Sequence, residues 1–157
     1  MIGSFIFTEM SPSAAGTTVS SQPVSSSNIA GNGIAAPLDD AEAIDIAVDM
    51  VGATGGTLDL YVQSSPDGGV NWYDIVHFPQ LTAGAPAIKY QAPLSLFTNS
   101  TAPVQVGKNL LPALAAGAIV QGAFSDRLRL VMVAGSGTTL GALVRMTVGT
   151  QRQSPRN

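Results

Sequence analysis

Alternation of apolar and polar residues over short segments is the feature that most constrains the fold of this chain. In residues 43–48, the apolar Ile44, Ile46 and Val48 alternate with Asp45 and alanine. Successive side chains of a strand point to opposite faces of a sheet, so this period of two predicts a half-buried β-strand. Further strands are predicted at 57–63, 72–78, 127–134 and 140–149, and near 88–92.

Turns rich in Gly, Pro, Asp and Asn separate these segments, and short strands with a turn about every 8–12 residues are typical of sandwiches and barrels. We therefore predict an all-β fold: an antiparallel β-sandwich, jelly-roll-like, with an extended N-terminal arm. Residues 109–122 fit two alternatives, a short helix or an irregular packed chain. The length of 157 residues suits one sandwich domain with its own core. Trp72 is the strongest single candidate for that core.

The composition divides the chain into three parts. Residues 1–36 are rich in Ser, Thr and Gly, so we predict an extended arm there. Its apolar start indicates an arm that docks on a neighbouring subunit, the alternative being an ordinary first strand followed by a long loop. Residues 37–150 are predicted to form the β-sandwich, and 151–157 a polar, basic tail. The candidate interface residues of the arm are Ile2, Phe5, Ile6 and Phe7.

Charge is scarce and unevenly distributed. Charged residues make up 11% of the chain, against about 25% in an average domain. This neutral surface fits either a β protein built of small residues or a surface covered in an assembly. Residues 1–88 contain nine acids and no base, whereas 89–157 contain seven bases and one acid, giving −9 and +6. This asymmetry predicts either pairing between strands of one sandwich or complementary faces that meet between subunits.

Three arginines are candidate interface residues within the second half. Arg127, Arg129 and Arg145 are predicted to line one face of a sheet, where they would pair with Asp59 or Asp74.

Several classes of chemistry lack the residues that they need. The chain has no cysteine and a single histidine, His77, so we predict no catalytic site, no metal site, no cofactor and no enzymatic activity. The acids Asp39, Asp40 and Glu42 fit a solvated turn without an EF-hand pattern. A pI of about 4.7 disfavours nucleic acid as a partner. We also expect no transmembrane helix, no signal peptide and no membrane partner.

One short motif has a defined geometry. Residues 65–72, SPDGGVNW, resemble the Asp-box, S-x-D-x-G-x-T-W, with asparagine in place of threonine. We predict a structural hairpin in which the aspartate accepts backbone hydrogen bonds and the glycines adopt positive φ. Sialidases repeat this box once per propeller blade, but this chain has one copy, so the resemblance implies a hairpin and no glycosidase activity. The matching hairpin residues are Ser65, Asp67, Gly68, Gly69 and Trp72.

The wider stretch 56–75 is similar to hairpins of small virion proteins of tailed bacteriophages, and residues 124–135 are similar to a later strand of such proteins. That resemblance implies a non-enzymatic structural protein of the capsid or head–tail neck, of the decoration, cement or connector-associated type. It also implies contacts with other virion proteins such as major capsid or neck proteins, and a place in virions assembled in the host cytoplasm. The scarce charge, the apolar arm and the charge asymmetry predict a homo-oligomer. The alternative is a carbohydrate-binding module, which needs an exposed aromatic platform. Its plausible members are Tyr61, Trp72, Tyr73 and Tyr90.

Overall fold

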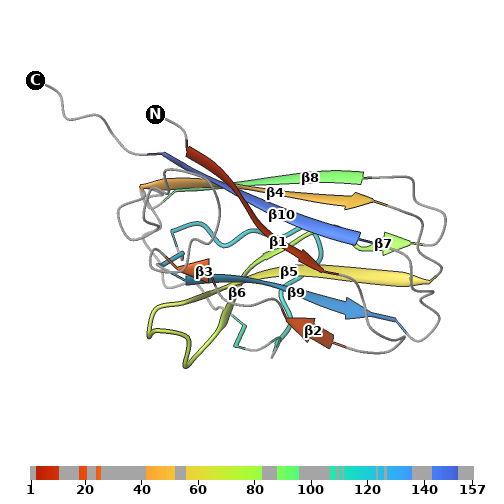
Figure 1. Cartoon of the computed structure of the whole chain (residues 1–157). Helices are drawn as coiled ribbons and strands as arrows, with labels where there is room; N and C mark the ends of the chain where they lie inside the picture. Colours follow the sequence, from red (N-terminus) through yellow and green to blue (C-terminus); the bar gives the residue numbers. More distant parts are fainter. Residues whose placement is uncertain are drawn as a thin grey trace, which may run out of the picture.

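The computed structural model is an all-β sandwich (Figure 1). It describes residues 3–10, 18–20, 24–25, 42–51, 56–82, 88–95, 107–108, 110, 112–122, 124–125, 127–135 and 143–151. The strands are β1 (Gly3–Met10), β2 (Thr18–Ser20), β3 (Val24–Ser25), β4 (Ala43–Val51), β5 (Thr57–Ser65), β6 (Tyr73–His77), β7 (Leu81–Thr82), β8 (Ile88–Ser95), β9 (Arg127–Ala134) and β10 (Leu143–Gln151). Within these ranges there is no helix, and hence none long and apolar enough to span a membrane.

Two antiparallel sheets lie one above the other in Figure 1. Sheet A has the order β1-β10-β4-β8. Sheet B has the order β2-β9-β5-β6, with β3 beside β2 on β9 and β7 beside β6 on β5. When β2 with β3 and β6 with β7 are each counted as one strand, successive strands alternate between the sheets along the chain, apart from the β5–β6 hairpin. The predicted antiparallel sandwich is therefore confirmed.

The core forms between the inner faces of the two sheets. Every second residue of β4, β5 and β9 is buried there, as the period of two predicted, because one face of each strand packs against the opposite sheet. The buried residues of these strands and of β10 include Ile44, Ile46, Val48, Leu58, Leu60, Val62, Leu128, Leu130, Met132, Met146 and Val148.

The predicted alternation over 72–78 is wrong, because a bulge lies in the pairing of β5 and β6. The register shifts between Val62 and Gln63, so Ile75 and Val76 are both buried in the core cluster. Asp74 is instead paired with Gln63 on the other face. A bulge inserts one extra residue into a strand, and the residues beyond it therefore face the opposite way.

The N-terminal segment contributes three strands to the sandwich. β1 pairs with β10, whereas β2 and β3 pair with β9. These pairings favour the alternative in which the chain opens with an ordinary first strand. The boundary expected near residue 37 and the tail beyond Gln151 lie outside the described residues, as does Ile2. For the three interface residues predicted within β1, the structure describes backbone pairing alone.

The described part of 107–122 is an irregular packed chain, so the helix alternative is wrong. This covering segment runs along the edge of β6, which it closes with four backbone hydrogen bonds. They are Asp74 N to Gly107 O (2.8 Å), His77 N to Ala118 O (3.0 Å), Gly117 N to His77 O (2.8 Å) and Val120 N to Ile75 O (2.8 Å). Because all of these donors and acceptors are backbone groups, no side-chain pattern in the sequence predicts that this segment pairs with β6.

Candidate functional site

The hairpin between β5 and β6 is held by the side chains that the Asp-box resemblance singles out. Ser65 Oγ donates to Asp67 Oδ1 at 2.8 Å, and Gly69 N donates to Ser65 Oγ at 2.8 Å. The amide nitrogen of Asn71 donates to Asp67 Oδ1 at 2.8 Å, and its side chain donates to Asp67 Oδ2. Gly68 and Gly69 have φ of 73° and 100°, a region that favours glycine. The predicted turn geometry is confirmed.

Trp72 packs against the base of this hairpin. Its indole Nε1 donates to Gly69 O at 3.0 Å, and 5% of the residue is exposed. The guanidinium carbon of Arg129 lies 4.3 Å from the ring centroid, within cation–π distance. The indole therefore ties the hairpin to β9 and is covered on that side.

The hydrogen bonds of the hairpin also set its acid sensitivity. The backbone amide of Asn71, followed by its side chain, lowers the pKa of Asp67 from 3.8 to about 2. A carboxylate with a lowered pKa stabilises the folded state above its ordinary pKa, and the contribution is lost as pH falls through the folded value.

We expect Asp67→Asn to remove part of the acid dependence of unfolding between about pH 4 and pH 2. The measurement is the denaturant midpoint of each variant at a series of pH values. Val70→Ala, at the exposed neighbour in the same turn, is the control and should keep the wild-type profile. An Asp67→Asn profile parallel to that of the wild type over this range would contradict the prediction.

A cluster of polar and aromatic side chains lies on the outer face of sheet B, away from the core. We call it the outer-face cluster, and it consists of Asp59, Tyr61, Gln63, Asp74, His77 and Arg129. Arg129 Nε donates to Gln63 Oε1 at 2.7 Å, and Gln63 Nε2 donates to Asp74 Oδ1 at 2.6 Å. Asp74 has no exposed surface, and this burial raises its pKa, which the bond from Gln63 opposes. Burial also lowers the pKa of Arg129.

His77 joins this cluster to the covering segment. Its Nδ1 lies 2.6 Å from Leu114 O, and its Nε2 lies 3.2 Å from Asp59 Oδ1. The ring stacks on Tyr61 with centroids 3.9 Å apart. A carbonyl oxygen only accepts, so Nδ1 is the donor. Burial, then Asp59 and Asp74, raises the pKa of Tyr61. This geometry positions the covering segment, and it makes His77 a buried, hydrogen-bonded strand histidine.

The outer-face cluster is not predicted as a unit by the sequence. The sequence predicts that Arg129 pairs with Asp59 or Asp74, and the structure links it to Asp74 through Gln63. The members of the cluster come from β5, β6 and β9, and the bulge turns Asp74 to this side. Only the alternation of polar residues in 59–63 offers a signal, and that pattern equally fits a solvated face.

The expectation that three arginines line one face is wrong. Arg127 and Arg129 lie on β9 in sheet B, whereas Arg145 lies on β10 in sheet A. The Cα register places Arg145 opposite Glu9 on one side and Asp49 on the other. The sandwich topology separates these arginines because the chain crosses from sheet B to sheet A between β9 and β10.

Acids of the first half of the chain therefore lie beside bases of the second half within one sandwich. Lys89 Nζ is 3.7 Å from Asp49 Oδ1 on the outer face of sheet A. Together with the Arg145 register and the Arg129–Gln63–Asp74 chain, this contact supports internal pairing as one cause of the charge asymmetry. The exposed pair itself contributes little to stability.

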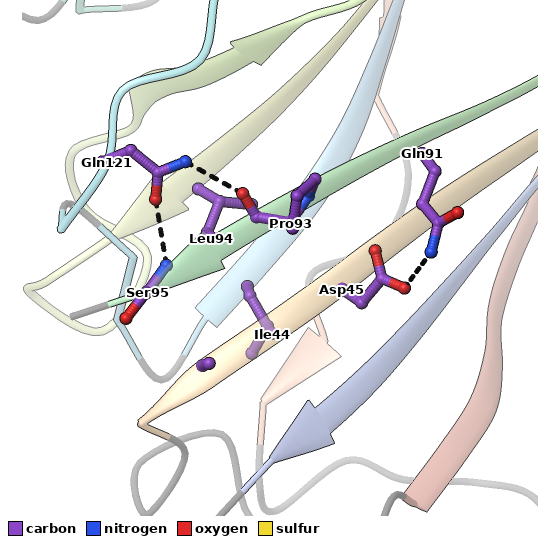
Figure 2. A pocket seen from close by; sticks show the side chains of 8 residues that line it. Ile44, Asp45, Gln91, Pro93, Leu94, Ser95 and Gln121 are labelled. Carbon is purple, nitrogen blue, oxygen red and sulfur yellow. Dashed lines mark hydrogen bonds between the residues drawn. The ribbon is translucent and has the colours of Figure 1, made fainter. Parts of the chain in front are cut away.

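Figure 2 shows a pocket of about 350 Å³ where the start of β4 meets the end of β8. Gln91 Nε2 donates to Asp45 Oδ2 in this pocket, while the buried Asp45 Oδ1 has no partner. The residue opposite Asp45 on β8 is Pro93, which has no N–H to donate. The side chain of Gln121 bonds Pro93 O at 2.9 Å and Ser95 N at 3.0 Å. The side-chain amide of Gln121 thus makes the hydrogen bonds to the edge of β8 that the backbone of a neighbouring strand would otherwise make.

None of the four aromatic residues expected for a sugar platform is fully exposed. Tyr61 and Trp72 are buried, and Tyr73 and Tyr90 are half-buried. Tyr90 stacks on Phe78 with ring centroids 5.7 Å apart. The condition that favoured the carbohydrate-binding alternative is therefore not met.

Across the described ranges, no group of three or more His, Asp or Glu side chains is arranged to hold a metal ion. The geometry instead provides a rigid sandwich, a braced hairpin and a covered sheet face. Comparison of the chain with protein-family models, with curated proteins and with solved structures finds no match.

Proposed function

We propose that this chain is a non-enzymatic structural subunit of a tailed-phage virion, which makes subunit contacts in the capsid or the head–tail neck region. The observation on which the proposal rests is the strand order. Sheet A interleaves early and late strands as β1-β10-β4-β8, and sheet B does the same as β2/β3-β9-β5-β6/β7.

This order supports a jelly-roll assignment. When β2 with β3 and β6 with β7 are each counted as one interrupted strand, eight strand positions follow the jelly-roll pattern. In that pattern successive strands alternate between two sheets, with a single hairpin in the middle. Jelly rolls are the architecture of many viral capsid proteins and of lectins. The buried aromatic side chains disfavour the lectin, and the jelly-roll order supports the structural role.

The surface of the subunit offers a contact point that fits this role. Val70, at the tip of the braced hairpin, is 79% exposed, the highest value among the large apolar side chains that the structure describes. A rigid apolar tip loses little conformational entropy when it docks, so it suits a subunit whose work is geometric.

The test is sedimentation of the pure chain, alone and mixed with the phage particle whose genome encodes it. We expect self-association at high concentration and co-sedimentation with the particle. Val70→Asp should weaken particle binding about tenfold, because burial of a valine contributes at least about 1.5 kcal/mol.

Ala116→Asp introduces the same charge at another exposed residue and should leave binding unchanged. A chain that stays monomeric at high concentration and does not bind the particle would contradict the structural role.

A further inference from the structure

The outer face of sheet A carries two acids of the same strand in opposite settings. Asp45 and Asp49 are four residues apart on β4, so their side chains point to the same side of the sheet. The neighbours of Asp49 are both basic, because the register places Arg145 of β10 on one side and Lys89 of β8 on the other. Lys89 Nζ lies 3.7 Å from Asp49 Oδ1. Asp49 therefore has its counter-charges within the sheet.

Asp45 has no such neighbours. Its register partners are Gly149 on β10 and Pro93 on β8, neither of which has a charge or a side-chain donor. Gln91 Nε2 donates to Asp45 Oδ2, whereas the buried Oδ1 has no partner. A buried acceptor without a partner costs free energy until a donor is supplied. The sheet leaves this carboxylate short of one donor and of a counter-charge.

The pocket of Figure 2 lies beside this carboxylate. Its volume of about 350 Å³ is within the range of small-ligand sites. Ala43, Pro93 and Leu94 contribute apolar surface to its walls, whereas Asp45 and Gln91 contribute oxygen acceptors. No lysine or arginine is among the described residues that line it. An anionic pocket with partly apolar walls suits a weakly hydrated cation that carries several N–H donors.

We propose that this pocket binds a guanidinium group, supplied either by an arginine side chain of a neighbouring subunit or by a small guanidinium compound. A guanidinium presents its donors in a planar fork that matches a carboxylate, so one donor can satisfy Asp45 Oδ1. Gln91 is exposed, so its side chain can rotate to admit the group and to accept a second bond through its amide oxygen. A guanidinium is also more weakly hydrated than an ammonium, which lowers the cost of entering the pocket.

The arginine of a neighbouring subunit would define the chemistry of one contact in the particle, and in that form the inference rests on the proposed function. The guanidinium site itself is independent of that function, because it is testable on the isolated chain.

The first test titrates the isolated chain with N-acetyl-arginine amide and follows the backbone amide resonances by NMR. We expect saturable shifts in the millimolar range, confined to the start of β4 and the end of β8. Asp45→Asn should weaken binding at least about tenfold, because a neutral amide replaces the charged acceptor. Asp49→Asn is the matched control on the same face of the same strand, and it should bind the probe like the wild type.

Two further probes separate the guanidinium from other groups on the unmodified chain, so this arm does not depend on a variant that folds. N-acetyl-citrulline amide has nearly the same shape without the charge and should not bind. N-acetyl-lysine amide should bind more weakly than the arginine probe. The site would be overturned by the absence of saturable shifts, by equal binding of the citrulline or lysine probe, or by equal losses in Asp45→Asn and Asp49→Asn.

Sedimentation with the phage particle identifies the source of the group. If a neighbouring subunit supplies an arginine, Asp45→Asn should weaken particle binding and Asp49→Asn should not. If the chain binds the arginine probe but Asp45→Asn binds the particle like the wild type, the ligand is a free guanidinium compound. A chain that binds the probe but never the particle contradicts the proposed function and leaves the site standing. Particle binding by a chain that does not bind the probe overturns the site alone.

Discussion

Replacement of Trp72 by alanine is expected to lower the free energy of unfolding by about 3–5 kcal/mol, the usual cost of removing a buried tryptophan. Trp72 is almost fully buried, and the residue connects three parts of the molecule. It donates to Gly69 O in the hairpin, it is covered by Arg129 of β9, and its backbone leads directly into β6. The loss would leave a cavity at the base of the hairpin and expose the underside of the Arg129 side chain.

Denaturant unfolding followed by circular dichroism measures this loss. Trp72→Phe should have an intermediate cost, because it keeps most of the apolar ring and loses the bond to Gly69. Val70→Ala, two residues away and largely exposed, should change stability by less than about 0.5 kcal/mol. If Trp72→Ala melted like the wild type, the indole would not hold the hairpin to β9.

Gly107→Ala has the second-largest expected effect, a destabilisation of about 1–3 kcal/mol, as for other overpacked sites. A Cβ at this position would lie 2.2 Å from Pro112 O and 2.7 Å from Asp74 Oδ2. The first of these atoms is backbone, so the covering segment must move to make room. That movement would stretch the bond from Asp74 N to Gly107 O, and the edge of β6 would begin to open.

The readout combines denaturant unfolding with hydrogen exchange of the Asp74 and His77 amides, both of which the covering segment protects. Gly135→Ala is the matched control, because the atom nearest to its Cβ would be the side-chain Oγ1 of Thr57, and the nearest backbone atom would be 3.4 Å away. It should cost less and leave exchange at β6 unchanged. Equal costs for the two variants, with no faster exchange at Asp74, would mean that Gly107 is not a point of close approach.

Local sequence was sufficient to locate most strands and the hairpin. The period of two placed β4, β5 and β9 within a few residues of their observed bounds, because every second side chain of each must enter the core. The Asp-box residues specified their turn for a similar reason. Asp67, Ser65 and Gly69 all bond within a few residues of one another, so the geometry is encoded where it forms.

The partners of each strand were decided only by the tertiary structure. Alternation of apolar and polar residues shows that a strand has one buried face. The alternation is the same whichever strand pairs with it, so it does not identify the partner. For this reason the sequence groups Arg145 with Arg127 and Arg129, although β10 and β9 belong to different sheets. It is also why the N-terminal strand has no evident partner in the sequence, since β10 is more than 130 residues away along the chain.

The outer-face cluster depends on contacts of the same long range. One bulge in β6, opposite the step from Val62 to Gln63, turns Asp74 toward Gln63 and Arg129. The covering segment closes the edge beside it. Both features arise from register and from main-chain hydrogen bonds, which every residue type except proline can donate and accept. The sequence by itself therefore determined which side chains of β4, β5 and β9 enter the core and how the hairpin turns. Only the tertiary structure decided which polar groups contact each other, because these contacts join residues that lie far apart in the sequence and share no local pattern.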